Sequence, residues 1–405
     1  MKRRSSNIPP LMELISRFFK IPRESFILMG PRGTGKSTWL RDSLPDAIQL
    51  DVETPSLRHT LAARPQRLRE LLAEPPAPRT VVLDEIQHVP KLLRTVRQTL
   101  AKPSPPHFVL AASGSRIFSR GADGHADLRL PRHSFHPLMA AELRNFNLER
   151  ALRHGMLPEA VTAANPQRVI EDYTQVYIAD VMARGLTRHI GRFRRFLQAL
   201  STAHGKPLNI ASVARRCAVE RKIVAGYIAI LEDLMLAFRV PVYAKRTLAS
   251  RAGVSDARRI TVSRDKLFLF DAGFFRALLP EDSTGRQAEH DLQALAGLVA
   301  QHILAWSAYS GFDAQLSYWR TRAGTEVDLV VHGAAGIQAF RIQNGEDVGP
   351  RDLRALRALR KDHPDVEAVI LYRGSKTIRI DGVRCLPVED FLRRMRPDRG
   401  LLELV

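Results

Sequence analysis

The segment Phe26–Thr38 constrains the fold of this chain more than any other stretch. Residues 30–37 match the pattern Gly-x-x-x-x-Gly-Lys-Ser/Thr of a phosphate-binding loop. An apolar run over residues 26–29 precedes the loop and predicts a buried parallel strand. The residues after Ser37 are typical of a first helical turn. The pattern therefore lies between a strand and a helix, which is the context that phosphate binding by such a loop requires.

Each residue type in the loop has a chemical role. Glycines at positions 30, 33 and 35 allow tight turns that bring backbone N–H groups onto phosphate oxygens. The N-terminus of the following helix adds a partial positive charge. We expect Lys36 to reach the β- and γ-phosphates and the Ser37 hydroxyl to bind Mg²⁺. The residues expected around the nucleotide are Gly30, Pro31, Arg32, Gly33, Thr34, Gly35, Lys36, Ser37 and Thr38.

A second motif supports a nucleotide site. Residues 80–85 read as an apolar strand that ends in two carboxylates, Asp84 and Glu85. Asp84 is suited to hold Mg²⁺, partly through water, and Glu85 to polarise an attacking water molecule. The alternative is an acidic pair that caps a helix. A further strand ends at Ser113, which is placed to contact the γ-phosphate, although Ser-Gly is also ordinary turn chemistry.

Strands and helices alternate in the N-terminal part of the chain. We expect strands at residues 48–52, 80–84 and 108–112, and helices at residues 11–19, 57–72 and 91–100. This alternation predicts a parallel, three-layer α/β sheet. Residues 137–195 have a mostly helical pattern, which we interpret as a lid that follows the sheet.

The charge of the chain favours a polyanionic partner. The 405 residues carry a formal net charge of +20, with a pI near 10.7. Nucleic acid is the first expectation and an anionic membrane surface the second, and codon bias toward arginine is the alternative explanation. Two distant cysteines, Cys217 and Cys385, exclude a disulfide framework and indicate a reducing, cytoplasmic compartment. We expect no signal peptide, since Glu13 and Arg17 interrupt the first apolar stretch, and no membrane span.

The spacing of three predicted helices indicates a helix-turn-helix. They cover residues 193–200, 210–217 and 221–235, with a tight turn over residues 218–220. Arg221 and Lys222 open the third helix, where such helices enter a major groove. The basic segment 245–266 would form a wing, and Arg258 and Arg259 within it are expected to contact DNA. The alternative is a winged helix that only packs against protein.

The chain from about residue 285 is predicted to form a separate mixed α/β domain. Helices are expected at residues 292–306 and 351–359, and strands at residues 314–320, 326–331, 338–342 and 366–372.

Together these motifs resemble a family of prokaryotic AAA+-type P-loop ATPases with a C-terminal region of uncharacterised function. The matching segments, which span most of the chain, are Gly30–Thr38, Val82–Pro90, Ala112–Ser115, His136–Leu138 with Glu142 and Leu143, and Lys266–Gly273. The resemblance implies ATP binding and hydrolysis, a winged helix, and a C-terminal fold like that of the PD-(D/E)xK nucleases. One departure precedes His136, where Leu128-Arg129 replaces the usual Gly-Arg and keeps the arginine.

The C-terminal region departs further from the pattern of a working nuclease. Such a site needs an acid on one strand and Asp/Glu-x-Lys on the next, because the carboxylates hold a metal and the lysine activates water. Asp328 supplies the first acid, but Arg341 and Gln343 stand where the second acid and the lysine belong. Ala296 also replaces an acid on the first helix. We expect Arg341 to pair with Asp328 and to repel a divalent cation, which leaves this domain catalytically dead.

The preferred interpretation is an α/β ATPase that binds ATP and Mg²⁺ and couples its nucleotide state to DNA binding. The expected domains are a P-loop core at 1–140, a helical lid at 141–192, a winged helix-turn-helix at 193–284 and a degenerate nuclease-like domain at 285–405. Glu85 and Lys36 would be catalytic, together with an arginine that neutralises transition-state charge. Arg129 is the first candidate for it, and Arg116 and Arg120 are rivals.

Two alternatives remain open. One is a slow, nucleotide-gated scaffold for a protein partner, and the other is an ATP-controlled nuclease. A homo-oligomer also stays open as a partner, because it would let the arginine act in trans.

Overall fold

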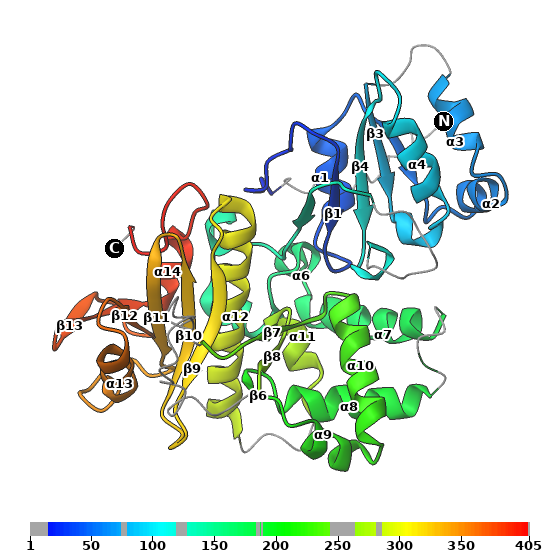
Figure 1. Ribbon diagram of the computed structural model, residues 1–405. Coiled ribbons are helices and arrows are strands. Elements are labelled where there is room, and N and C mark those ends of the chain that lie inside the picture. Colours follow the sequence, from blue (N-terminus) through cyan, green and yellow to red (C-terminus); the bar gives the residue numbers. More distant parts are fainter. Residues whose placement is uncertain are drawn as a thin grey trace, which may run out of the picture.

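Figure 1 shows the computed structural model of the chain, which describes residues 15–73, 79–118, 128–183, 187, 189–243, 264–280 and 286–403. A parallel sheet, a helical middle part and a second, larger sheet follow one another along the sequence (blue and cyan, green, then yellow to red). The predicted fold class is confirmed, because the first sheet is parallel and of the kind found in P-loop NTPases.

The N-terminal sheet has five strands, and all of their pairings are parallel. In spatial order they are β2 (Ile48–Asp51), β3 (Thr80–Asp84), β4 (His107–Ala112), β1 (Phe26–Met29) and β5 (Arg132–Ser134). Its helices are α1 (Lys36–Ser43), α2 (Pro55–Ala63), α3 (Arg67–Ala73) and α4 (Leu92–Leu100).

Alternate residues of these strands bury their side chains on opposite faces of the sheet. One face, represented by Ile27 and Leu83, packs on α2, α3 and α4. The other face, represented by Leu28 and Val82, packs on α1 and on Phe19. The predicted three-layer arrangement follows from these two apolar surfaces.

Over its described residues, the middle part combines seven helices with a small antiparallel sheet in the order β6-β8-β7. Its helices are α5 (Leu148–His154), α6 (Pro158–Thr162), α7 (Pro166–Ala183), α8 (Ile190–Ser201), α9 (Ile210–Cys217), α10 (Arg221–Asp233) and α11 (Ala272–Ala277). Its strands are β6 (Lys206–Pro207), β7 (Ala237–Val240) and β8 (Lys266–Leu269).

The C-terminal part is built on a six-stranded mixed sheet. In spatial order its strands are β13 (Ile378–Ile380), β14 (Val383–Pro387), β12 (Glu367–Tyr372), β11 (Gly336–Ile342), β10 (Glu326–Gly333) and β9 (Gln315–Arg320). Its helices are α12 (Gln287–Ser310), α13 (Arg354–Asp362) and α14 (Val388–Arg394). Helices α12 and α14 pack on one face of the sheet, and α13 packs on the other.

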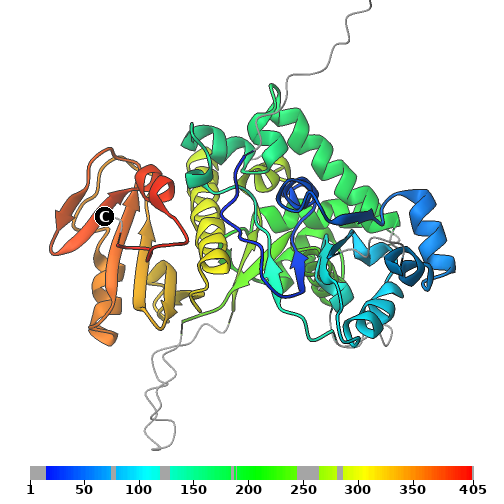
Figure 2. The same cartoon turned by 90° about the horizontal axis from the view of Figure 1, so that it is seen from above.

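Helix α12 joins the middle and C-terminal parts. One continuous apolar cluster contains residues of α5, α11, α12 and the C-terminal sheet, so this long helix is buried on nearly all sides (Figure 2). Lys266 of β8 adds a polar connection, because its buried ammonium lies 2.6 Å from Glu326 of β10 and over the ring of Tyr318. The predicted domain boundaries remain predictions. The hydrophobic core is continuous between the middle part and the C-terminal domain that is predicted to begin at residue 285.

The segment Lys266–Gly273, which resembles a family motif, holds α11 against the turn after α5. The Asp271 carboxylate accepts hydrogen bonds from the backbone N–H of Phe274 at 3.0 Å and of Met156 at 2.7 Å. Burial raises the pKa of Asp271 to about 6. A Cβ on Gly273 would lie 2.3 Å from the carbonyl oxygen of His154, so only glycine allows this contact.

Two predicted helices are corrected by the structure, and three elements of the C-terminal sheet were not predicted. Residues 15–19 are not helical, so the predicted helix at 11–19 is wrong over its described part. The helix predicted at 57–72 is two helices, α2 and α3, because Pro65 interrupts the chain between them. Strands β13 and β14 and helix α14 complete the C-terminal sheet beyond the last predicted strand.

The predicted wing lies mostly outside the described residues, and so do Arg258, Arg259 and Arg120. Within the described ranges, no helix is both long enough and apolar enough to cross a membrane.

We predict that Gly273→Ala lowers the free energy of unfolding by roughly 1–3 kcal/mol, because its methyl group would press on a backbone carbonyl that is fixed by neighbouring packing. The midpoint of thermal unfolding measures the loss. Gly226→Ala in α10 is the matched control, since no atom lies near its Cβ. We expect this control to stabilise the chain by about 0.5–1 kcal/mol. Equal effects of the two substitutions would contradict the packing explanation.

Candidate functional site

The residues predicted to bind nucleotide meet at one edge of the N-terminal sheet. The phosphate-binding loop follows β1, Asp84 ends β3, and Ser113 follows β4. Because β1, β3 and β4 are parallel, their carboxyl ends lie side by side (Figure 1). Ligands of open α/β sheets bind at this edge.

The loop has the backbone that its glycines predict. Gly33 and Gly35 adopt positive φ angles of 79° and 90°, which favour glycine. A Cβ on Gly30 would lie 2.2 Å from the carbonyl oxygen of Phe135. Helix α1 begins directly after the loop, at Lys36. The backbone of the loop therefore lies directly before the N-terminus of a helix. A phosphate site requires this combination of loop and helix end.

The Lys36 ammonium is buried at the centre of the site. It donates hydrogen bonds to the carbonyl oxygens of Gly30 at 2.9 Å and Pro31 at 3.0 Å, and to the hydroxyl of Ser113 at 3.2 Å. Burial lowers the pKa of Lys36, whereas the charges of Glu85 and Asp84 oppose this effect. The lysine thus connects the end of β1 to the end of β4.

Both carboxylate oxygens of Glu85 are held. The Ser113 hydroxyl donates to one oxygen at 2.6 Å, and the Gln87 side-chain amide donates to the other. Burial alone would raise the pKa of Glu85, but the Lys36 charge and these two hydrogen bonds together hold it below its usual value. Glu85 keeps a positive φ of 53°, an unfavourable conformation for a residue with a side chain, so its position is set by these contacts.

Asp84 lies in a different environment. Burial raises the pKa of Asp84, and a hydrogen bond from the Ser37 side chain lowers it. The Ser37 and Asp84 side chains therefore lie close enough to interact, and their role as magnesium ligands stays a prediction. Mg²⁺ at nucleotide sites needs only one or two protein oxygens besides the phosphates and waters, so this pair fits the ion. The described residues contain no cluster of three or more His, Cys, Asp or Glu side chains that could hold a metal without a nucleotide.

Two tyrosines of α7 clamp the loop from the helical side. The Tyr173 hydroxyl donates to the Arg32 carbonyl oxygen at 2.8 Å, and the Tyr177 hydroxyl accepts from the Arg32 backbone N–H at 2.5 Å. A Cβ on Gly33 would lie 3.0 Å from the Tyr173 ring. The sequence pattern contains no signal for this clamp, because the two tyrosines lie more than a hundred residues from the loop.

A cavity of about 530 Å³ opens beside the loop. It is lined by residues of the segment 15–21, by Gly35, by Thr38 and Trp39 of α1, and by Pro158 and Thr162 of α6. Its volume and mixed apolar and polar lining are those of a small-molecule site. The sequence carries no signal for this cavity, apart from Gly35 and Thr38 on its wall.

Two of the three predicted arginines, Arg129 and Arg116, lie within the described residues. Arg129 is exposed on the segment that leads to β5, and Arg116 is exposed after Ser115. The charge of Arg32, by contrast, acts on both Lys36 and Glu85, and its side chain lies 2.8 Å from Glu53.

The segment after Ser113 contacts the C-terminal end of α10. The Ser115 backbone N–H donates to the Asp233 carbonyl oxygen at 2.7 Å. A Cβ on Gly114 would lie 2.7 Å from the same oxygen. At the other end of α10, Arg221 and Lys222 are exposed. Arg221 also lines an open groove of about 760 Å³ together with Arg192 and Arg215.

In the C-terminal sheet, Asp328 is engaged by Arg341. One guanidinium nitrogen of Arg341 lies 2.8 Å from both carboxylate oxygens, and the Ile342 backbone N–H donates to one of them at 2.8 Å. The predicted ion pair is confirmed. Gln343 donates to Asp352 at 2.9 Å instead of facing a free site.

Comparisons with known families match three regions of the chain. Residues 22–144 match a model described as an AAA domain. Residues 145–285 match a domain of unknown function (DUF8612), which covers both the predicted lid and the predicted winged helix. Residues 293–391 match a second domain of unknown function (DUF4143).

Comparisons with individual proteins add little. No curated protein is significantly similar to the chain in sequence. Among solved structures, the crystal structure of protein VC1899 from Vibrio cholerae aligns over 91% of this chain and 96% of its own, at 11% identity and a TM-score of 0.23. Values this low establish no shared fold. The chain thus has a P-loop ATPase-like AAA domain toward its N-terminal end and a DUF4143 domain toward its C-terminal end.

Proposed function

We propose that this protein binds ATP with Mg²⁺, hydrolyses it, and couples its nucleotide state to DNA binding. The observation that supports ATP hydrolysis best is the connection of Lys36, Ser113 and Glu85 by hydrogen bonds of 3.2 and 2.6 Å at adjacent strand ends. A cation that donates hydrogen bonds to phosphate oxygens, a carboxylate that activates water and a hydroxyl that contacts both are components of a site for phosphoryl transfer to water.

In this proposal, residues 30–38 hold the phosphates, and the cavity beside Trp39 holds the base and ribose. Bound Mg²⁺ would neutralise charge on the phosphates, with Ser37 and Asp84 as its protein ligands. Lys36 exchanges its loop carbonyls for phosphate oxygens, which are stronger acceptors because they are charged. Glu85 then accepts a proton from the attacking water.

An arginine would complete the site, and its identity stays a proposal. Arg129 is the first candidate from the sequence, and it would act in trans within a homo-oligomer. Arg32 is an additional candidate in cis, since its charge already acts on Glu85.

We predict that Glu85→Gln retains ATP binding and loses at least ~10²-fold in turnover, because the amide cannot accept the proton of water. Lys36→Ala should lose binding as well. Phosphate release and the equilibrium affinity for ATP are the two measurements. Glu70→Gln on exposed α3 is the matched control and should behave like the parent. Parental turnover in Glu85→Gln would show that the site lies elsewhere.

The coupling to DNA is proposed through α10. Helices α9 and α10, separated by residues 218–220, have the spacing of a helix-turn-helix. The small sheet β6-β8-β7 completes what we propose to be a winged helix. Since Ser115 contacts one end of α10 and Arg221 opens the other, a change at Ser113 on nucleotide binding would reach the basic end of the helix. The net charge of +20 supports a polyanionic partner.

We predict that replacing Arg221, Lys222, Arg258 and Arg259 with Ala weakens DNA binding and flattens its dependence on salt. Each phosphate contact that is lost lowers the slope of log affinity against log salt by about 0.9. Fluorescence anisotropy of labelled duplex at several salt concentrations measures this slope. The control is a double variant that replaces two exposed lysines of the AAA domain, Lys91→Ala and Lys102→Ala. An unchanged slope would favour a nucleotide-gated protein scaffold instead.

The C-terminal domain is proposed to be a nuclease-like fold without nuclease activity. The Arg341 guanidinium occupies both oxygens of Asp328, which a divalent cation would otherwise need. Two free buried cysteines agree with a proposed cytoplasmic setting.

We predict that the purified protein leaves supercoiled and linear DNA uncut in Mg²⁺ or Mn²⁺, with or without ATP. Gel electrophoresis of the DNA after incubation is the measurement. Cleavage that disappears in Asp328→Ala would establish an ATP-controlled nuclease and overturn the proposal.

A further inference from the structure

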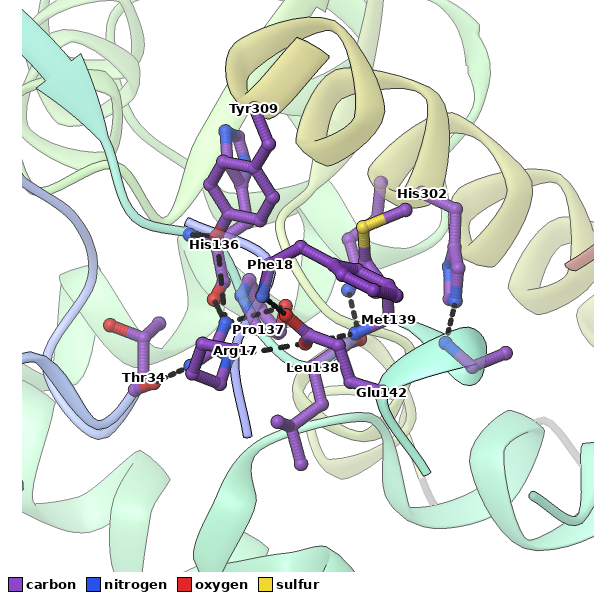
Figure 3. A network of polar contacts seen from close by, with 12 residues as sticks. Arg17, Phe18, Thr34, His136, Pro137, Leu138, Met139, Glu142, His302 and Tyr309 are labelled. Atoms are coloured by element: carbon purple, nitrogen blue, oxygen red, sulfur yellow. Dashed lines mark hydrogen bonds and ion pairs between the residues drawn. The ribbon is translucent and has the colours of Figure 1, made fainter. Parts of the chain in front are cut away.

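A buried arginine that belongs to no recognised motif contacts the phosphate-binding loop. The Arg17 side chain is 4% exposed and stacks on the Phe135 ring, 4.2 Å from its centroid. Its guanidinium donates to the Thr34 carbonyl oxygen at 2.8 Å, to the His136 carbonyl oxygen at 2.7 Å, and to Glu142 at 3.1 Å (Figure 3). It therefore joins the loop to the chain that follows β5.

The contact with Thr34 has a geometric consequence for phosphate binding. In a planar trans peptide, the C=O and the next N–H point in opposite directions. Because Arg17 donates to the Thr34 carbonyl oxygen, the N–H of Gly35 is directed away from Arg17 and stays available for a phosphate oxygen. Backbone N–H groups in this position bind phosphate oxygens. Arg17 thereby fixes one of the loop's donors before any ligand arrives.

The position of Arg17 is set in turn by Glu142 and by the C-terminal part of the chain. The Glu142 side chain is fully buried, and it also accepts from the backbone N–H groups of Phe18 at 2.7 Å and Met139 at 2.9 Å. The Tyr309 hydroxyl, on the last turn of α12, accepts from the His136 N–H at 2.8 Å and lies 3.5 Å from Arg17 (Figure 3). Helix α12 thus supports the same peptide segment that Arg17 binds.

We infer that Arg17 is a positioning residue of the nucleotide site, and that Tyr309 of α12 makes the affinity of the phosphate-binding loop depend on how the C-terminal part is docked. This inference rests on the proposed ATP-binding function. It adds that Arg17, which also lines the cavity proposed for the base and ribose, acts on phosphate binding through Thr34 and Gly35, whereas Lys36 would contact the phosphates directly.

The test compares Arg17→Lys and Tyr309→Phe with the parent in ATP affinity and in turnover at saturating ATP. Lysine keeps a cation beside Glu142 but cannot hold three acceptors in a fixed plane. Phenylalanine keeps the ring and removes only the hydroxyl. We expect the Kd for ATP to rise about tenfold in Arg17→Lys and about threefold in Tyr309→Phe, with kcat nearly unchanged. If Arg17 and Tyr309 only stabilised the fold, the substitutions would instead lower the fraction of active protein. The apparent kcat would then fall while the Kd for ATP stayed unchanged.

Two substitutions elsewhere are matched controls. Arg384→Lys alters a partly buried arginine paired with Glu367, and Tyr372→Phe removes a hydroxyl that donates to the Lys376 carbonyl oxygen, and both contacts lie within the C-terminal sheet. Both should bind ATP like the parent. Parental Kd values in Tyr309→Phe and in folded Arg17→Lys would overturn the inference, and if Arg17→Lys does not fold, Tyr309→Phe alone decides. A parent chain that does not bind ATP would instead contradict the proposed function.

Discussion

The buried ammonium of Lys36 is the interaction on which the rest of the site depends. A cation removed from water requires several well-placed acceptors, and here the loop carbonyls of Gly30 and Pro31 and the Ser113 hydroxyl supply them. The Ser113 hydroxyl in turn donates to Glu85, whose negative charge partly compensates the positive charge of Lys36. The ends of β1, β3 and β4 are therefore held in one arrangement by a single charged group.

The same requirement explains how distant segments shape the phosphate-binding loop. Three side chains, those of Lys36, Tyr173 and Arg17, hold carbonyl oxygens of the loop, and Tyr177 accepts from the Arg32 N–H, so these contacts fix the backbone of the loop. Tyr173 comes from the middle part of the chain, and Arg17 is supported by Tyr309 from the C-terminal part. We interpret the loop as a place where all three parts of the chain meet, which makes nucleotide binding sensitive to each of them.

Local patterns in the sequence predicted the parts of this site that depend on local chemistry. Residues 30–38, Asp84 and Glu85 follow apolar strands, and their backbone is determined by glycine and by strand ends. The Arg341 contact with Asp328 was also predictable, because β10 and β11 are neighbours with Leu329 opposite Phe340. The sequence offered no signal for Arg17, Gln87 or the tyrosine clamp, because their roles arise only when segments far apart in the chain come together. The break at Pro65 was missed because helical spacing of apolar residues continues across it.

The central claim is that nucleotide chemistry at Lys36 and Glu85 is coupled to DNA at α10. The most direct measurement is the steady-state rate of phosphate release from ATP and Mg²⁺ by the purified chain, alone and with saturating duplex, single-stranded or branched DNA. The account predicts a measurable rate without DNA that changes severalfold with at least one of these DNAs, as coupling energies of about 1–3 kcal/mol imply. A rate that no DNA alters, from a chain that binds DNA equally well with and without ATP, would contradict it.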